Sequence, residues 1–335
     1  MTVLPELLEL LACPRDNAPL EQSAAGFITC SHGHTYPVVD GIPVLLIDRS
    51  ENDARGFWTQ RVTDSSLSFA ANVETDTFDG VGIHPHVQDI LASTGGFMYK
   101  GIKLESYPIP ELRMPHGEGR TLLDVGCNWG RWTVAAAKAG YRVTGIDPHL
   151  VALRAARHVA RAEGVTVHFV CGDARVLPFR AESFDRAFSY SVVQHFAKSE
   201  ARVMLQQMAQ AIKPGGQMMV QMPNRAGIRS FYHLARRGFG DGKAFDVRYY
   251  SVRELVSLFR SVVGPSTLKV DGFFGLGIQP TDLPLMPPHR RIVIHSSELL
   301  RKAARRQRWI AGFADSLYIT SQKPMVVAPG PPPRP

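Results

Sequence analysis

Apolar and polar residues alternate along the middle of the chain with two distinct periods. Short apolar runs such as TLLDV (121–125) and YRVTGID (141–147) have the length and composition of buried strands. The segments that follow them, RWTVAAAKAG (131–140) and PHLVALRAARHVARAEG (148–164), have helical spacing, and each closes at a glycine. Strands that alternate with helices form βαβ units, so the pattern predicts an α/β domain with a parallel sheet covered on both faces.

The same alternation continues to about residue 225 and then loosens. Three more strands and one helix are expected before that point. A helix, a strand, a long insert and a closing strand are expected after it. In order, the segments are VTVHFV (165–170), FDRAFSYS (184–191), the helix MLQQMAQAI (204–212), GQMMVQM (216–222), the helix SVRELVSLFRS (251–261), TLKVDGFF (267–274) and DSLYITSQ (315–322).

Changes in composition divide the chain into four parts. Residues 1–49 are expected to form a small β module of their own, and residues 50–118, rich in Gly, Pro and His, a linker and lid region. Residues 119–320 form the predicted α/β domain. Its insert at about 275–314 opens with an apolar, loop-like stretch of the kind that covers a substrate. Residues 321–335 are too rich in proline to pack and are predicted to be disordered.

The charge of the chain is uneven. The formal net charge is +8, and the densest basic run is RKAARRQR (301–308), which has the spacing of a helix. Because no aromatic residue interrupts that run, a solvated helical face is favoured over a nucleic-acid-binding patch.

Membrane and secretory signals are lacking along the chain. No apolar run approaches the roughly 20 residues that span a bilayer, and the first residues carry acids where a signal peptide carries cations. We therefore expect a cytoplasmic enzyme with no membrane partner. Cys127 and Cys171 fall beside predicted strands and are expected to be small buried residues and not part of a disulfide framework.

The turn after the first strand, LLDVGCNWGRW, is the expected place for a ligand, because open parallel sheets bind ligands at the carboxyl ends of their strands. Gly126 and Gly130 allow a tight bend and close approach, and Asn128, where a third glycine might be expected, tolerates a left-handed conformation. The next two strands end at Asp147 and Asp173. Either acid alone could cap its following helix, but acids at successive strand ends suit an adenosine with a cationic sulfonium and suit a pyrophosphate poorly.

Five segments in this order resemble the class I S-adenosylmethionine-dependent methyltransferase family: DVGCNWG, GIDP, CGDARVLPF, FDRAFSYSVVQHF and IKPGGQMMV. The resemblance covers residues 119–225 and implies a Rossmann-like, seven-stranded sheet with a final antiparallel hairpin. It implies that the glycine loop lines the methionine side of the cofactor, that Asp147 binds the ribose and that Asp173 and Ala174 meet the adenine. The expected cofactor-binding residues are Asp124, Gly126, Cys127, Asn128, Gly130, Asp147, Pro148, Asp173, Ala174, Ser189 and Tyr190.

The fourth strand runs into Gln194 and His195, next to where the methyl group should lie. A histidine titrates near neutrality, so His195 is the candidate general base; the alternative is that it caps or packs the following helix. Tyr249 and Tyr250 could also reach an acceptor, although packing is the more common role for tyrosines in such a segment.

The N-terminal module contains a pattern typical of a metal site. Cys13 and Asp16 form one short turn, and Cys30 and His34 form another after a hairpin-sized gap, with His32 as an alternative to His34. Zinc prefers four such ligands in structural sites, although a carboxylate is a less common one. The alternative is a ribbon without metal, held by an apolar core. The segment also resembles the small zinc-ribbon family that partners and activates tRNA and protein methyltransferases, and its Cys-x-x-x-His turn resembles rRNA guanine methyltransferases with an N-terminal ribbon.

Three functions remain open from the sequence. The favoured one is methyl transfer from S-adenosylmethionine to oxygen or nitrogen of a small-molecule acceptor. The second is an RNA methyltransferase that uses the ribbon and the basic helix to bind nucleic acid. The third is a non-catalytic binding or activating subunit that keeps the cofactor-binding fold and no longer transfers methyl groups.

Overall fold

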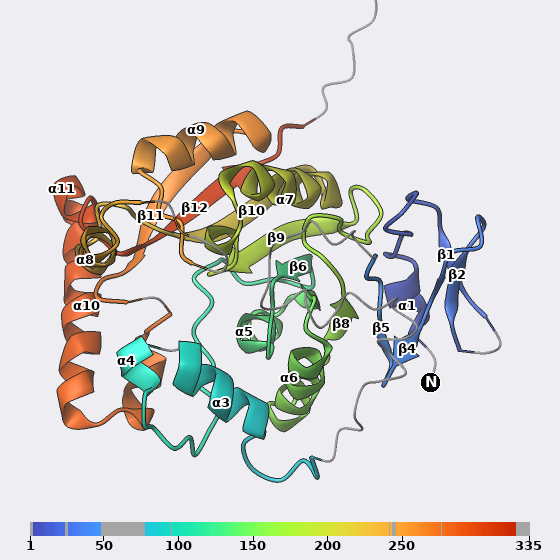
Figure 1. The fold of residues 1–335 in the computed structure, drawn as a ribbon, viewed down its shortest axis with the longest axis horizontal. Helices are drawn as coiled ribbons and strands as arrows, with labels where there is room; N and C mark the ends of the chain where they lie inside the picture. Colours follow the sequence, from blue (N-terminus) through green and yellow to red (C-terminus); the bar gives the residue numbers. More distant parts are fainter. Residues whose placement is uncertain are drawn as a thin grey trace, which may run out of the picture.

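The computed structural model describes residues 3–23, 26–47, 78–94, 96–240, 242, 246–275 and 277–325. Residues 50–77 of the expected linker and residues 326–335 of the proline-rich tail lie outside this set. Figure 1 shows a large α/β part with a small β module against one side of it.

A seven-stranded sheet forms the centre of the large part, in the order β11-β12-β10-β9-β6-β7-β8. Neighbouring strands from β10 to β8 run parallel, whereas β12 is antiparallel to both β10 and β11. This arrangement confirms the predicted fold class. The strands are β6 (Thr121–Val125), β7 (Arg142–Asp147), β8 (His168–Cys171), β9 (Phe184–Tyr190), β10 (Ile212–Pro223), β11 (Ser266–Gly272) and β12 (Ser316–Gln322).

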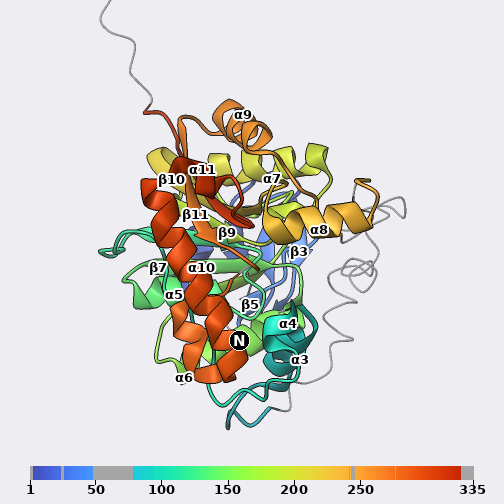
Figure 2. The same ribbon diagram turned by 90° about the vertical axis from the view of Figure 1, so that its left-hand side faces the viewer.

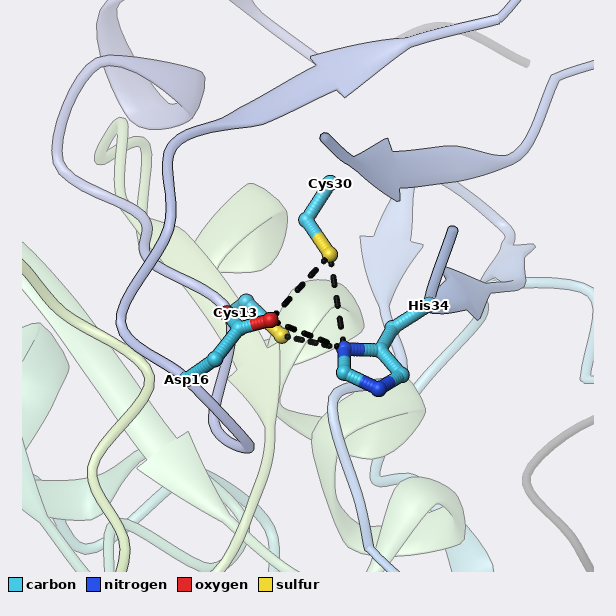
Figure 3. Close-up of side chains that lie close together, drawn as sticks. All are labelled: Cys13, Asp16, Cys30 and His34. Atoms are coloured by element: carbon cyan, nitrogen blue, oxygen red, sulfur yellow. Dashed lines mark hydrogen bonds and ion pairs between the residues drawn. The ribbon is translucent and has the colours of Figure 1, made fainter. Parts of the chain in front are cut away.

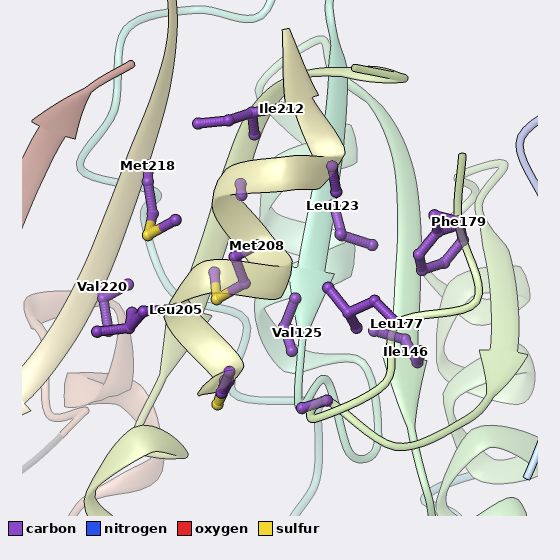
Figure 4. Close-up of a cluster of buried hydrophobic side chains, with 14 of the residues drawn as sticks. Leu123, Val125, Ile146, Leu177, Phe179, Leu205, Met208, Ile212, Met218 and Val220 are labelled. Atoms are coloured by element: carbon purple, nitrogen blue, oxygen red, sulfur yellow. The ribbon is translucent and has the colours of Figure 1, made fainter. Parts of the chain in front are cut away.

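Helices cover both faces of this sheet because alternate side chains of each strand point to opposite faces. On β6, Leu123 and Val125 pack with Met208 in one buried cluster, and Leu122 packs with Trp132 in another. Figure 4 shows the first cluster beneath the helix that carries Met208. The helices against the sheet are α5 (Arg131–Lys138), α6 (Leu150–Ala162), α7 (Lys198–Ala211) and α9 (Val252–Val262).

The N-terminal module joins the edge of the sheet at β8. Leu45 donates its backbone N–H to Cys171 O at 2.7 Å, Val44 forms a parallel bridge with Cys171, and Ala12 N–H donates to Pro178 O at 3.0 Å. Unpaired strand edges invite association, and this contact covers one of them. The module consists of α1 (Pro5–Leu8), an antiparallel sheet of β1 (Leu20–Gln22), β2 (Ile28–Cys30) and β3 (Thr35–Tyr36), and the pair β4 (Val38–Val39) and β5 (Ile42–Pro43).

The segments outside this sheet are mainly helical. Among its described residues, the first part of the insert contains one short helical element, η2 (Pro280–Leu285). Its second part is the long helix α10 (Pro288–Arg306), followed by α11 (Arg308–Ala311). No helix within the described ranges is both long and apolar enough to cross a bilayer. The remaining elements are α3 (Pro85–Thr94) and α4 (Gly96–Tyr99) before the sheet, η1 (Val193–His195) after β9, and α8 (Ile228–Arg236) after β10, a helix that the sequence analysis did not anticipate.

Candidate functional site

The glycine turn after β6 has the backbone conformation that its residues favour. Gly126 and Gly130 have φ angles of 79° and 81°, and Asn128 has a φ of 47°. A Cβ at Gly126 would lie 2.2 Å from Val192 Cγ2, so no side chain fits there. The expected left-handed conformation of Asn128 is confirmed, and the turn leaves its backbone close to the end of β7.

Asp147, at the end of β7, is bound by backbone groups on both carboxylate oxygens. Oδ2 accepts from Asn128 N–H at 3.0 Å, and Oδ1 accepts from His149 N–H at 2.9 Å. Burial raises the pKa of Asp147 to about 6, although the two backbone N–H groups oppose that rise. A carboxylate offers about four acceptor positions, so Asp147 can still accept two hydroxyl groups of a ligand.

Asp124, on the neighbouring strand β6, is a second buried carboxyl group. Its Oδ2 accepts from Thr133 Oγ1 at 2.7 Å. Burial, and to a smaller extent the nearby charge of Asp147, raise its pKa to about 7, although the hydrogen bond from Thr133 opposes that rise. Cys127 and Cys171 are buried free thiols, as expected, and Cys171 Sγ lies 3.4 Å from the Pro148 carbonyl oxygen.

Asp173, after β8, already has a strong partner. Arg175 Nε lies 2.9 Å and 3.0 Å from the two oxygens of Asp173, and Arg175 Nη1 is 3.6 Å from Glu200. Ala174 beside it is 8% exposed. This ion pair was not identified from the sequence, and it occupies acceptor positions of Asp173 that a ligand would otherwise use.

Ser189 and Tyr190, at the end of β9, differ in their surroundings. Ser189 is fully buried, and its hydroxyl donates to Val125 O at 2.8 Å, so its side chain serves the sheet. The Tyr190 hydroxyl donates to Asp271 Oδ2 at 2.5 Å and accepts from Gly277 N–H at 2.6 Å. Its ring stacks on Trp132 with a centroid separation of 4.4 Å.

A buried polar network extends from Tyr190 across three strands. Asp271 also accepts from Ser316 Oγ at 2.6 Å and from Arg113 Nη1 at 2.8 Å. Gln221 Nε2 donates to the Ser316 hydroxyl at 2.9 Å, and Gln221 Oε1 accepts from Ser191 N–H at 2.9 Å. The sequence analysis missed this network because its members lie far apart along the chain.

A second buried pair connects α5, the helix after the glycine turn, to segments that precede and follow it in the sequence. Arg131 Nη2 lies 3.0 Å from Asp282 Oδ1, which also accepts from the Tyr99 hydroxyl at 2.8 Å. Arg131 Nε donates to Pro108 O at 2.8 Å. The region before the sheet and the insert therefore meet over α5, beside the glycine turn.

His195 lies in η1, directly after β9. Its Nε2 is 3.3 Å from Gln194 Nε2, and its carbonyl oxygen accepts from Arg248 Nη1 at 2.8 Å. Tyr250 is buried beneath Lys198, and Tyr249 lies under Arg237. Of these candidates, His195 is the one at the carboxyl end of β9.

The four expected metal ligands of the N-terminal module lie together (Figure 3). Their ligand atoms all lie within 4.8 Å of one another. His34 Nδ1 is 3.4 Å from both Cys13 Sγ and Cys30 Sγ and 3.0 Å from Asp16 Oδ2. Bonds of about 2.0–2.3 Å in a tetrahedral zinc site place ligand atoms roughly 3.3–3.8 Å apart, so the set fits zinc. His32, the alternative, lies outside the set and hydrogen-bonds Asp16 Oδ2 at 2.8 Å.

Two family models match parts of the chain. Residues 122–216 match the model described as "Methyltransferase domain", and residues 5–41 match "Trm112p-like protein". The chain thus contains a methyltransferase domain of the α/β type. The module at its N-terminal side matches a Trm112p-like domain. The two matches confirm the resemblance of residues 119–225 to the class I methyltransferase family and that of the module to the small zinc-ribbon family, whereas the resemblance to rRNA guanine methyltransferases stays a prediction.

Individual relatives match over limited lengths. The chain is 32% identical to a ubiquinone biosynthesis O-methyltransferase of Chelativorans sp. over 108 residues, which are 32% of this chain and 42% of that protein. It is 27% identical to a probable tRNA methyltransferase 9B of Bos taurus over 137 residues, 40% of this chain and 28% of that protein. The chain thus spans less than half the length of these curated relatives.

One similar solved structure is that of a SAM-dependent methyltransferase of Methanosarcina mazei. Its TM-score is 0.45 and its sequence identity 19%, over 62% of this chain and 94% of that one.

Proposed function

We propose that the protein transfers a methyl group from S-adenosylmethionine to an oxygen or nitrogen atom of a small-molecule acceptor. The observation that carries the proposal is the buried carboxylate of Asp147 at the end of β7, which accepts from Asn128 N–H of the glycine turn and from His149 N–H and keeps about two further acceptor positions. The methyltransferase domain match over residues 122–216 supports the same reaction, and the names of the O-methyltransferase relatives support a small-molecule acceptor.

The cofactor supplies a methyl group that is already activated on a sulfonium. Asp147 binds the ribose hydroxyls, the backbone of the glycine turn lines the methionine part, and Ala174 and Asp173 lie toward the adenine. Because the donor is activated, the protein contributes mainly orientation. For a hydroxyl acceptor, His195 accepts the proton on its imidazole nitrogen. The acceptor lies between the carboxyl end of β9, the region around Tyr99 and the insert around Asp282.

Thermal unfolding with and without S-adenosylhomocysteine tests this function. Ligand at about a hundred times its dissociation constant stabilises the wild type by about 2.7 kcal/mol, a rise of several degrees in Tm. Asp147→Ala removes that rise. It also lowers the Tm of the ligand-free protein, because Asn128 N–H and His149 N–H lose their acceptor, but the variant still unfolds cooperatively because the apolar core is unchanged. The proposal fails if neither protein responds, and the non-catalytic binding protein then becomes the better account.

The RNA alternative differs in its response to salt. An enzyme that binds RNA through phosphates loses affinity steeply as salt rises, whereas the turnover of a small neutral acceptor barely changes. The match to a probable tRNA methyltransferase is the observation that keeps this alternative open. Measuring the KM for the acceptor as a function of ionic strength separates the two.

In this proposal a structural zinc ion is bound by Cys13, Asp16, Cys30 and His34. The observation that supports it is the separation of their ligand atoms, which lies close to that of a tetrahedral site. His34→Ala is expected to lose stoichiometric zinc in elemental analysis, and to lower Tm. The matched control is His32→Ala, which changes a neighbouring histidine outside the set and should retain the metal. Equal zinc content in His34→Ala and the wild type would rule out this site.

A further inference from the structure

Helix α8 turns an apolar stripe toward solvent. Ser230 and Leu234 are its buried residues. On its other side Ile228, Phe231 and Tyr232 are 46%, 56% and 55% exposed. Surface helices of globular proteins normally bury their apolar stripe, so α8 presents a surface suited to an apolar partner.

The segments that carry the stripe and its neighbours are basic in sequence, although Arg237 lies 3.7 Å from Asp246. Residues 224–240 contain four arginines and no acidic residue. Residues 286–313, which include α10 and α11, contain seven lysines and arginines and a single acid, Glu298. Glu298 is already paired with Arg301. Much of the excess positive charge of the chain is therefore concentrated in these two segments.

The apolar surface continues from α8 onto α11. Ile228 N–H donates to Phe313 O at 3.3 Å, and the rings of Phe313 and Trp309 are 6.4 Å apart. Phe313 and Trp309 are 52% and 67% exposed. Beyond Phe231, the ring of Phe239 lies 5.6 Å away and extends the surface at the other end of α8.

The same surface reaches α10 across a groove lined by Arg229, Phe274, Ile292, Val293 and Ser296. On α10, Ile292 and Leu299, two helical turns apart, are 65% and 70% exposed. Figure 2 shows α10 and α8 on one side of the molecule. We call this surface the basic-apolar face. Its exposed apolar members are Ile228, Phe231, Tyr232, Phe239, Ile292, Leu299, Trp309 and Phe313.

The basic-apolar face lies at the carboxyl edge of the sheet. Helix α8 follows the carboxyl end of β10 at Pro223, and α10 and α11 connect the end of β11 to the start of the antiparallel β12. The glycine turn and His195 also lie at carboxyl ends of parallel strands, so the face and the candidate site share one edge of the molecule.

We propose that the basic-apolar face docks on the surface of an anionic lipid bilayer. Exposed aromatic and aliphatic side chains among arginines and lysines are the composition of an interfacial membrane contact, in which the apolar groups enter the headgroup region and the cations meet lipid phosphates. Contact of this kind needs no spanning segment, so it is compatible with the absence of a membrane-spanning helix in the described residues. Docking turns the carboxyl edge toward the bilayer, from which an apolar acceptor enters.

Lipid fits this face better than RNA does. Proteins hold single-stranded RNA with aromatic rings that stack on bases and with cations along the backbone. Three of the exposed apolar members, Ile228, Ile292 and Leu299, are aliphatic and offer no such platform. They do offer apolar area to acyl chains.

Vesicle binding of the full chain tests the proposal without any need for methyl transfer. The chain is expected to co-sediment with phosphatidylcholine vesicles that contain phosphatidylglycerol and to remain in solution with phosphatidylcholine alone.

Variants separate the apolar and the charged parts of this contact. Phe231→Ser combined with Trp309→Ser should weaken binding by about tenfold or more, because each ring loses its contact with lipid. Arg305→Gln combined with Arg306→Gln should weaken it by a smaller factor, and raised salt should reproduce that loss. Val203→Ser on α7, a 40% exposed position outside the face, is the matched control and should bind like the wild type.

Fluorescence reports which side chain meets the lipid. The chain has four tryptophans, and Trp58, which lies outside the described residues, is replaced by Phe for this measurement. Of the other three, Trp309 is largely exposed, whereas Trp129 and Trp132 are 5% and 7% exposed. Anionic vesicles should therefore shift the emission to the blue, and brominated acyl chains should quench it, in Trp58→Phe but not in the Trp58→Phe, Trp309→Phe double variant.

Three results would overturn the proposal. One is no binding to anionic vesicles at low salt. Another is binding that the Phe231→Ser, Trp309→Ser double variant retains. The third is that the protein does not bind vesicles but binds an RNA oligonucleotide, and that the same substitutions weaken this RNA binding.

Discussion

The two halves of the central sheet differ in how far apart in the sequence their hydrogen-bonded polar residues lie. In the half that we propose to bind the cofactor, formed by β6–β8 and their turns (the cofactor half), Asp147 is hydrogen-bonded to residues 19 and 2 positions away. In the half that we propose to face the acceptor, formed by β9–β12 and the insert (the acceptor half), Tyr190 is hydrogen-bonded to Asp271 across 81 positions, and Asp282 to Tyr99 across 183. Polar residues of a turn can therefore be identified from a short segment of sequence. A buried network forms only when segments that are distant in the sequence pack together, so it cannot be identified in that way.

The largest expected effect comes from breaking the network of the acceptor half. Asp271→Ala leaves the guanidinium of Arg113 and the hydroxyls of Tyr190 and Ser316 without their shared acceptor. We expect the free energy of unfolding to fall by about 4 kcal/mol in urea denaturation, because the remaining groups stay buried.

Asp246→Ala is the control for that loss. Asp246 is 53% exposed and lies 3.7 Å from Arg237, a surface pair worth about 0.5 kcal/mol. A loss at Asp271 no larger than this would mean that the acceptor half does not depend on its network.

An intermediate effect is expected from the turn of the cofactor half. Gly126→Ala places a Cβ 2.2 Å from Val192 at a φ of 79°, whereas Gly119→Ala has a φ of 78° and no atom within 4 Å of its Cβ. Gly119→Ala therefore measures the strain of the left-handed conformation alone, about 1 kcal/mol. Gly126→Ala adds the clash, and we expect about 3 kcal/mol in total. Similar losses at both positions would show that the turn can move away from Val192.

The smallest expected effect is the dependence of ligand affinity and of stability on pH, which tests the role of Asp147. Its pKa of about 6 predicts that affinity for S-adenosylhomocysteine falls by up to about tenfold per pH unit below pH 6, since a protonated carboxyl loses acceptor capacity. Stability without ligand should change in the opposite direction. The raised pKa values of Asp147 and Asp124 favour folding at low pH, and that contribution is lost as pH rises through about 6 to 7. Calorimetric titration of the wild type and Asp147→Asn checks this, because the variant should show a flat, weak affinity over the same range.

The fold was predictable to the extent that each element is specified by its own residues. The βαβ alternation, the glycine-closed helices and the left-handed Asn128 follow from local periodicity and turn chemistry. Helix α8 was missed because its first turn is capped from a distance: Asp315 Oδ1 accepts from Arg229 N–H at 2.6 Å and from Ser230 N–H at 3.1 Å. Most of its large apolar residues are exposed, so they do not form the apolar stripe of a helix that packs on a core.

The candidate site was also predictable where its residues lie close together in the sequence, and not where they come from distant segments. Short spacings identified the residues of the glycine turn with Asp147, and the four candidate metal ligands of the N-terminal module. The structure brings each set together. The Asp173–Arg175 pair was missed although it is local, because a two-residue spacing does not determine whether an arginine turns back on the acid. The Tyr190–Asp271 contact depends on the order of strands in the sheet, which no short segment encodes.

The central claim, that Asp147 binds the ribose of an adenosyl cofactor, is tested most directly by calorimetric titration with S-adenosylhomocysteine and its 2′-deoxy analogue. In the wild type, removal of the hydroxyl should weaken binding by about tenfold, the worth of a hydrogen bond to a charged group. Asp147→Ala should bind both ligands weakly and to the same extent, because the group that distinguishes them is gone. A variant that still prefers the intact ribose by the wild-type factor would contradict the account and assign the ribose to another residue.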